Sequence, residues 1–405
     1  MALEGLRGLC ALLVIFGHVT FQAPVLDPGY SCDLLHIDYG PQAVFVFFVI
    51  SGYVIGLTSR PPATGVAIRH YCSRRLLRIV PIAWTAIIAT WLLFRRNSLS
   101  DVLGNLLFLQ NAQAYPFGQR VAVLYDDPPL WSLSFEMLYY AAFILVWTGG
   151  FRMLGVFAFT ILVAFSDILG FPAIFSHYAA YFVYWLCGLC IAWRARPAHE
   201  DARVAWPSAV GVAFAIWRLE PIHTLLAAAA PLAPVLDPDR FQIDALLGSV
   251  LIVLAVTRRA PILQGRLRTV AVLLGFCALP LKLWLGVLSY VDLVEGAILC
   301  LCILGWNWRP SLRPLALLGP VGLVSYALYA TAYPLMRLVY RCPGLPSGSA
   351  ASFLLRVVIY GALCGAIAVF LERIMQPRWV RWMTALFRLR PAGVPQTTPL
   401  RISES

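Results

Sequence analysis

The sequence predicts an all-α, polytopic integral membrane protein, a bundle of ten to twelve transmembrane helices with both termini in the cytoplasm. Of its 405 residues, 60% are hydrophobic and only 12% are charged, whereas soluble domains are about 45–50% apolar and about 25% charged. The apolar residues gather in runs that approach the ~20 residues a helix needs to cross the hydrocarbon core. Basic and acidic loops alternate between these runs, which predicts the orientation.

Twelve apolar segments are candidates for the membrane-crossing helices. Three of them are shorter than a crossing needs, which sets the predicted number between ten and twelve. We expect one transmembrane domain over residues 1–376 and a basic, disordered cytoplasmic tail over 377–405. The twelve segments lie at 5–23, 40–58, 79–95, 131–149, 152–171, 177–195, 205–218, 243–257, 269–288, 290–306, 317–340 and 352–374.

Arginines gather in alternate loops. The loop at 59–78 carries five arginines and the loop at 258–268 carries four, whereas the opposite loops hold aspartates such as Asp126 and Asp127. Loops rich in Lys and Arg stay in the cytoplasm, so both termini are expected there. The same asymmetry accounts for the net charge of +12. We therefore expect membrane lipid, and not nucleic acid, as the partner of this basic chain.

The first apolar segment carries one basic side chain, Arg7, and one histidine, His18. Their spacing corresponds to about three turns of α-helix, so both project from one face, about 16 Å apart along the axis. An imidazole deep in the bilayer is costly unless it faces protein or water, which makes His18 a candidate functional residue. The alternatives are an Arg7 side chain that reaches the headgroups and a His18 bonded to a backbone carbonyl.

A second motif, SRRLLRIVP at 73–81, holds three arginines at the entrance of an apolar run. The spacing lets Arg75 and Arg74 each share a helical face with Arg78. Guanidinium groups bind phosphate oxygens in forked pairs, so the cluster suits a polyphosphate ligand. Taken alone, it is more simply explained by topology determination or by contact with anionic lipid.

A third motif, PPLWSLSFEMLYY at 128–140, places Ser132 and Glu136 on one face at the head of a helix. A carboxylate beside apolar residues is normally paired, and an imidazole is a natural partner. The alternative is a helix-entry carboxylate in the headgroup zone. The loop before this motif, at 96–130, mixes polar and aromatic residues. This composition is equally typical of a sugar-binding loop and of an ordinary exposed loop.

Other polar residues within the apolar segments favour structural roles. We expect Lys282 to form an ion pair between neighbouring helices with Asp292 or Glu295. Most of the ten cysteines lie inside apolar segments, where Cys acts as a small core residue. Their spacing predicts no metal site.

These motifs resemble, in order, segments of the membrane-bound acyltransferase 3 family, whose members O-acylate cell-envelope glycans. Members often carry a His shortly after the last of these segments, where this chain has Ala332. Many also carry a fused C-terminal hydrolase-like domain, so this chain resembles the stand-alone type. The matching segments read LEGLRGLCALLVIFGHV, VFVFFVISGYVIG, RRLLRIVPIAW, LWSLSFEMLYY, YFVYWLCGLCIAW and LGPVGLVSYALYATAYPL.

The resemblance implies an O-acyltransferase of the bacterial inner membrane, and most simply an acetyl-CoA-dependent O-acetyltransferase. Acetyl-CoA or another acyl-CoA would be the donor, and no metal would be required. The acceptor would be a polysaccharide, lipopolysaccharide or lipid-linked saccharide. The alternative is a transporter or flippase for a glycan precursor, which an internal repeat with broken helices would favour.

The resemblance also implies roles for the motif residues. The arginines would bind the phosphates of CoA, namely Arg7, Arg74, Arg75 and Arg78. His18 would be the general base toward the acceptor hydroxyl, or would carry the acyl group transiently. Glu136 would orient His18, and Ser132 would position the acceptor or a water molecule.

Overall fold

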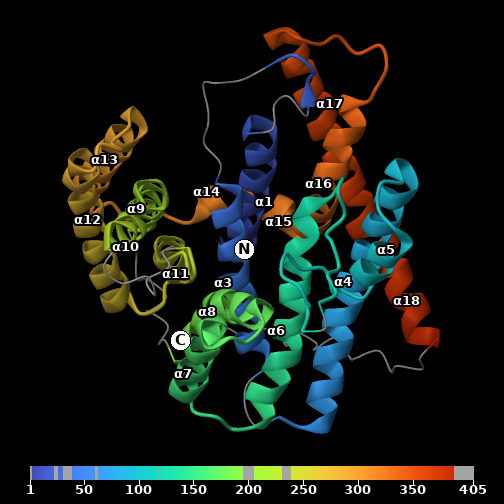
Figure 1. Ribbon diagram of the computed structural model, residues 1–405, viewed down its shortest axis with the longest axis horizontal. Helices are drawn as coiled ribbons and strands as arrows, with labels where there is room; N and C mark the ends of the chain where they lie inside the picture. The colour runs from blue at the N-terminus through green and yellow to red at the C-terminus, as the bar shows by residue number, and fades with distance from the viewer. Residues whose placement is uncertain are drawn as a thin grey trace, which may run out of the picture.

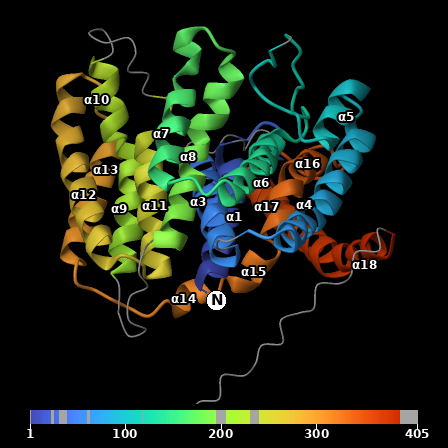
Figure 2. The same ribbon diagram turned by 90° about the horizontal axis from the view of Figure 1, so that it is seen from below.

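The protein is a helical bundle, and its structure is a computed structural model. The predicted all-α membrane protein is confirmed, because the described part of the chain forms helices and turns with no strand. Seen from below, the long helices run side by side, with the N-terminus next to α14 and α15 at one end (Figure 2). The structure describes residues 2–21, 26–30, 39–59, 63–116, 118–194, 205–229 and 239–386.

The helices form two groups (Figure 1). The α9–α13 helices make one group, and α11 packs against α3 and α8 to join it to the other. The helices are α1 (Ala2–Phe21), α3 (Gly40–Thr58), α4 (Gly65–Phe94), α5 (Leu99–Leu106), η2 (Pro128–Leu130), α6 (Trp131–Thr148), α7 (Met153–Ala164), η3 (Ser166–Leu169), α8 (Ala173–Arg194), α9 (Trp206–Leu219), α10 (Pro221–Ala229), α11 (Ile243–Thr257), α12 (Pro261–Trp284), α13 (Tyr290–Leu304), α14 (Arg313–Ala316), α15 (Gly319–Leu323), α16 (Ser325–Tyr340), α17 (Ala350–Val369), η4 (Phe370–Met375) and α18 (Gln376–Leu386).

Eight helices in the described ranges are long and apolar enough to cross a membrane. Four of the predicted spans are instead shorter helices: α7, α11, α13 and α16 have 12, 15, 15 and 16 residues. At 1.5 Å per residue they are about 18–24 Å long, less than the ~30 Å hydrocarbon core. The count of ten to twelve spans and the cytoplasmic termini therefore stay predictions.

The segment predicted as one span at 317–340 is divided. It forms the short helix α15 and then α16, with a break at Val324. Gly319, Pro320 and Gly322 are poor residues for a helix interior, so this stretch does not continue into α16 as one straight helix. The division leaves Ser325 at the first position of α16.

Close packing of backbone on backbone holds α3 against α8. Gly52 on α3 faces the Trp185 carbonyl oxygen, and Gly188 on α8 faces the Val49 carbonyl oxygen. A Cβ atom added at either glycine would lie well inside van der Waals contact with that oxygen. Small residues at helix crossings allow this approach in membranes, where packing and not water exclusion drives helix association.

The N-terminal half of α1 is seated in the same way. Gly5 lies against the Leu315 carbonyl of α14, and Gly8 lies against the Leu318 carbonyl just before α15. These two contacts fix the turn of α1 that carries Arg7. The predicted helix around Arg7 and His18 is confirmed as α1.

The expected ion pair between helices is confirmed with Asp292 as the partner. Lys282 Nζ lies 2.7 Å from Asp292 Oδ1, and Asp292 also closes a capping box with Ser289 at the start of α13. Glu295 does not bind the lysine and accepts a hydrogen bond from the Tyr39 hydroxyl at 3.2 Å.

The chain continues as a helix past the predicted end of the domain. A π-helix, η4, follows α17 and leads directly into α18. Disorder was expected from residue 377 onward, but the first residues of that tail are helical, and α18 combines Arg378 and Arg381 with Trp379 and Trp382. Such a composition suits the membrane interface, which explains the helix. Residues 387–405 lie outside the described ranges.

Gly188→Ala should destabilise the protein by about 2 kcal/mol or more, because the new methyl group overpacks the α3–α8 crossing. The matched control is Gly361→Ala on α17, where a Cβ meets no atom within 4 Å. Thermal melting and gel filtration in detergent measure both variants. Equal melting temperatures for the two would contradict this account of the crossing.

Candidate active site

A pocket of about 200 Å³ lies among α1, α3, α4, α6 and α16. Apolar residues of α3, such as Phe47 and Phe48, form part of its wall. The polar groups come from all five helices, so the pocket exists only when these helices pack together. They are Glu4, Arg7, Ser51, Arg75, Arg78, Ser132, Glu136, Tyr140, Ser325, Tyr326 and Tyr329.

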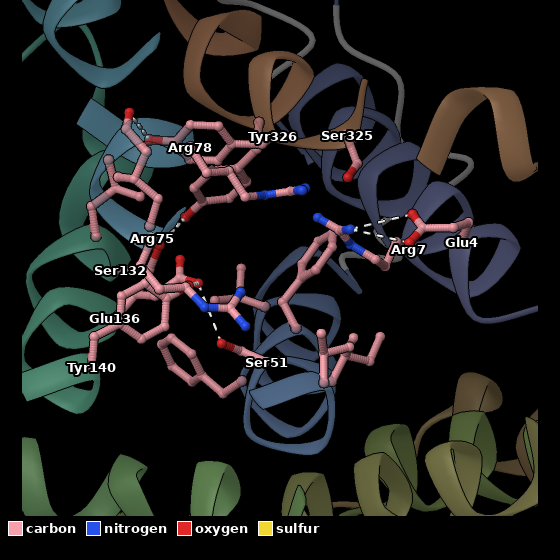
Figure 3. Close-up of a pocket in the computed structure, with 18 residues that line it drawn as sticks. Glu4, Arg7, Ser51, Arg75, Arg78, Ser132, Glu136, Tyr140, Ser325 and Tyr326 are labelled. Carbon is pink, nitrogen blue, oxygen red and sulfur yellow. Dashed lines mark hydrogen bonds and ion pairs between the residues drawn. The ribbon is translucent and has the colours of Figure 1, made fainter. Parts of the chain in front are cut away.

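Three arginine side chains reach this pocket from two walls. Arg7 extends from α1, and Arg75 and Arg78 extend from α4 on the other side (Figure 3). Arg7 is held by Glu4 of the preceding turn, with Nη1 3.2 Å from Oε2. The Arg75 guanidinium lies 5.5 Å from the centre of the Tyr140 ring, within cation–π range. The structure thus brings together Arg7, Arg75 and Arg78, three of the four arginines that the sequence singled out. Their role as phosphate-binding residues stays a prediction.

Glu136 supplies negative charge between the arginines. Its Oε1 atom accepts hydrogen bonds from Ser51 Oγ at 3.3 Å and from the Tyr140 hydroxyl. The positive charge of Arg78 repels the guanidinium group of Arg7, whereas the carboxylates of Glu4 and Glu136 attract it. The described contacts of Glu136 thus tie it to the pocket wall and do not include His18.

Ser132 is bonded to α16. Its Oγ lies 2.8 Å from the Tyr329 hydroxyl, which also donates to the Pro129 carbonyl. Because the Tyr329 hydrogen is used toward that carbonyl, Ser132 is the donor to Tyr329. The Ser132 oxygen keeps its capacity to accept a hydrogen bond from a ligand.

His18 lies next to the pocket and does not line it. Its ring meets the Tyr333 ring edge-on, with centroids 5.5 Å apart. Tyr333 is one helical turn along α16 from Tyr329, and Tyr329 lines the pocket. His18 is therefore about one turn of α16 beyond the pocket, on the side away from Arg7.

Arg74 also lies outside the pocket. It is exposed, whereas Arg75 and Arg78 of the same helix are partly buried. The spacing rule places Arg74 and Arg78 near one face of α4 but does not indicate which of them other helices cover. Ala332, which stands where members of the family that the chain resembles often carry a His, is fully buried.

A further carboxylate, Glu372, interacts electrostatically with two of these arginines, Arg78 and Arg7. It lies in the π-helix η4, where the charges of Arg78 and Arg7 act on it. Its Oε1 atom is buried without a hydrogen-bond partner. The next helix is tied to the same place, because Gln376 Nε2 donates to the Arg78 carbonyl at 2.9 Å.

Sequence reasoning did not select several of these groups. Tyr140 is four residues from Glu136, so helical spacing could have indicated that pair. Ser51 is a polar residue inside an apolar run, which is a weaker signal. Glu372 lies inside the last apolar segment, at 352–374, but the sequence indicates no partner for it. Among the described residues, no group of three or more His, Cys, Asp or Glu side chains could hold a metal ion.

Comparison with known proteins gives three curated relatives. A membrane-bound transacylase, BcsY, from Komagataeibacter xylinus is 30% identical over 46% of this chain. The acyltransferase MdmB from Streptomyces mycarofaciens is 30% identical over 35% of this chain. The exopolysaccharide production protein ExoZ from Rhizobium meliloti (strain 1021) is 37% identical over 27% of this chain.

These matches cover only part of each relative, namely 44%, 38% and 34% of their respective lengths. No solved structure matches the chain. The acyltransferase domain, in contrast, matches residues 2–373, nearly the whole chain. The match includes α1, the arginines of α4, the Ser132–Glu136 segment and α16. The chain therefore belongs to the acyltransferase 3 family of membrane-bound acyltransferases.

Proposed function

We propose that the protein transfers an acyl group, which we take to be acetyl, from acyl-CoA to a hydroxyl group of an exported glycan. The observation that carries the proposal is the convergence of Arg7, Arg75 and Arg78 on one pocket inside an apolar bundle. Clustered guanidinium groups need an anionic partner, and the phosphates of CoA are one. ExoZ and BcsY are named for exopolysaccharide production and transacylation, which supports a glycan acceptor.

The donor would bind with its phosphates at the three arginines. Glu4 and Glu136 balance these charges when the pocket holds no donor. In this proposal the arginine end of the pocket faces the cytoplasm, where acyl-CoA is made. Arg74 has no part in phosphate binding, because it is exposed away from the pocket.

The acyl end of the donor would point from the arginines toward His18. The two positions are separated by about 16 Å along α1, a distance that the long pantetheine arm of CoA can cover. Ser132 and Tyr329 lie between them. The Ser132 oxygen can accept a hydrogen bond from the pantetheine amide or from the acceptor hydroxyl.

The transfer step exchanges a thioester for an oxygen ester. The acceptor oxygen forms a bond to the acyl carbon as the C–S bond breaks. His18 removes the hydroxyl proton and returns it to the CoA sulfur, which leaves as the thiol. In this proposal Glu136 stabilises the arginine cluster, and contact with Tyr333 orients His18.

Membrane vesicles that contain the protein should consume labelled acetyl-CoA and release CoA thiol. The label should appear in alkali-labile esters of the glycan extracted from the same vesicles. Vesicles without the protein are the control. A glycan that crosses the membrane with no thioester consumed would contradict the proposal and favour the transporter alternative.

His18→Ala should lower glycan acylation by at least about a hundredfold, since it removes the proposed general base. His223→Ala is the matched control, because His223 is partly exposed and pairs with Asp239 in the other helix group. Ester formation per amount of folded protein measures both. If His18→Ala retained activity near that of the wild type, the result would contradict this mechanism.

Arg75→Gln and Arg78→Gln should each raise the KM for acetyl-CoA by about tenfold or more, because each loses a charge-assisted hydrogen bond to phosphate. Arg74→Gln should leave KM unchanged, which makes it the control on the same helix. Initial rates at varied acetyl-CoA separate the three. An effect on acceptor use with no change in donor KM would place the donor elsewhere.

A further inference from the structure

Asp127 is a buried carboxyl group that the protein leaves without a partner. Its exposed fraction is 0%, and neither of its carboxyl oxygens has a hydrogen-bond partner among the described residues. Its backbone is fixed, because the Asp127 amide donates to the Leu124 carbonyl and the Leu130 amide donates to the Asp127 carbonyl. The backbone turn thus fixes the position of Asp127 without any hydrogen bond to its side chain.

The neighbouring Asp126 forms ion pairs with two arginines, Arg337 and Arg96. Its Oδ1 atom lies 3.1 Å from Arg337 Nε and 3.7 Å from Arg96 Nη1. Both guanidinium groups also face the ring of Tyr125, which is 58% exposed. Asp126 therefore has a structural ion pair close to the surface, and Asp127 has none.

Asp127 lies where the pocket and His18 approach each other. It directly precedes η2, which leads into the helix of Ser132. Its carboxyl group lies near enough to the hydroxyl groups of Tyr329 and Tyr333 to interact with them electrostatically. Tyr329 lines the pocket and Tyr333 contacts His18, so one carboxyl group is close to both.

A buried carboxyl group with no partner costs stability, and a native protein normally keeps such a group for a functional reason. Burial and the adjacent Asp126 raise the pKa of Asp127 well above its ordinary range. Burial thus favours the protonated form, in which the carboxyl group can both donate and accept a hydrogen bond. A sugar hydroxyl has the same two capacities and is a matching ligand.

We propose that Asp127 binds the acceptor hydroxyl of the glycan and holds it beside His18. The inference rests on the proposed function and adds the acceptor side of the site to it. Asp127 lies on the side of the pocket away from Arg7, so donor and acceptor approach His18 from opposite ends of the bundle. Asp127 orients the hydroxyl, whose proton still passes through His18 to the leaving sulfur.

The test replaces Asp127 with an apolar residue of similar shape. Asp127→Leu should keep or raise the melting temperature, because it removes an unsatisfied buried group. It should bind CoA as the wild type does but lower ester formation on the glycan by about tenfold or more. Asp127→Asn keeps a donor and an acceptor, and should retain more activity than the leucine variant.

Asp126→Asn is the neighbouring control, and it should lower the melting temperature because it weakens the ion pair with Arg337. Three measurements are made on each purified variant in nanodiscs or native vesicles: melting temperature, binding of CoA, and labelled ester formed from acetyl-CoA per CoA released. Asp127→Leu should release more CoA per ester formed, since water then replaces the held hydroxyl.

Unchanged ester formation by Asp127→Leu would overturn the role of Asp127. A fall in melting temperature like that of Asp126→Asn, or a loss of CoA binding, would overturn it too, because the group would then be structural. A wild-type protein that consumes no acetyl-CoA would instead overturn the proposed function itself. The two failures are therefore distinguishable.

Discussion

Mutual repulsion of three guanidinium groups inside an apolar bundle is the constraint on which the rest of this site depends. Arg7, Arg75 and Arg78 lie around one pocket, where like charges are poorly screened. Carboxylates offset them from separate elements: Glu4 from α1 and Glu136 from α6. Because these charges are divided among α1, α4 and α6, the balance holds only while the three helices stay packed. The glycine contacts that seat α1 and α3 therefore serve the electrostatics of the site as well as the fold.

Helix α16 positions three polar or aromatic contacts along its length. At intervals of four residues it presents Tyr329 to Ser132, Tyr333 to His18, and Arg337 to Asp126. Side chains four apart lie on one ridge of a helix, so one element sets the depth of three polar contacts. This ridge links the arginine pocket to the far end of the bundle. The break between α15 and α16 matters for this reason, since it sets where the ridge begins.

Sequence patterns predicted the helices well and the contacts between them only in part. Apolar runs identify α1, α3 and α4 because lipid-facing and core-facing residues are both apolar. They did not reveal the break at Val324, although Gly319, Pro320 and Gly322 just before it are poor residues for a helix interior. The motifs placed Arg7, Arg75, Arg78, Ser132 and Glu136 together, but the partner expected for Glu136 was His18, whereas its partners are Ser51 and Tyr140. The side of the helix on which Glu372 lies could not be predicted, because a π-helix departs from the regular helical period on which such predictions rest.

The position of His18 on the same rigid helix as Arg7 has a consequence for how the chain can vary. The ten helical residues between them set the distance and the angle between the two side chains. One residue inserted or deleted there would turn His18 by about 100° and carry its ring away from Tyr333. The loops of this protein can change in length, but this stretch of α1 cannot. Its apolar side chains can be substituted, but the number of residues is fixed by the distance that must separate Arg7 from His18.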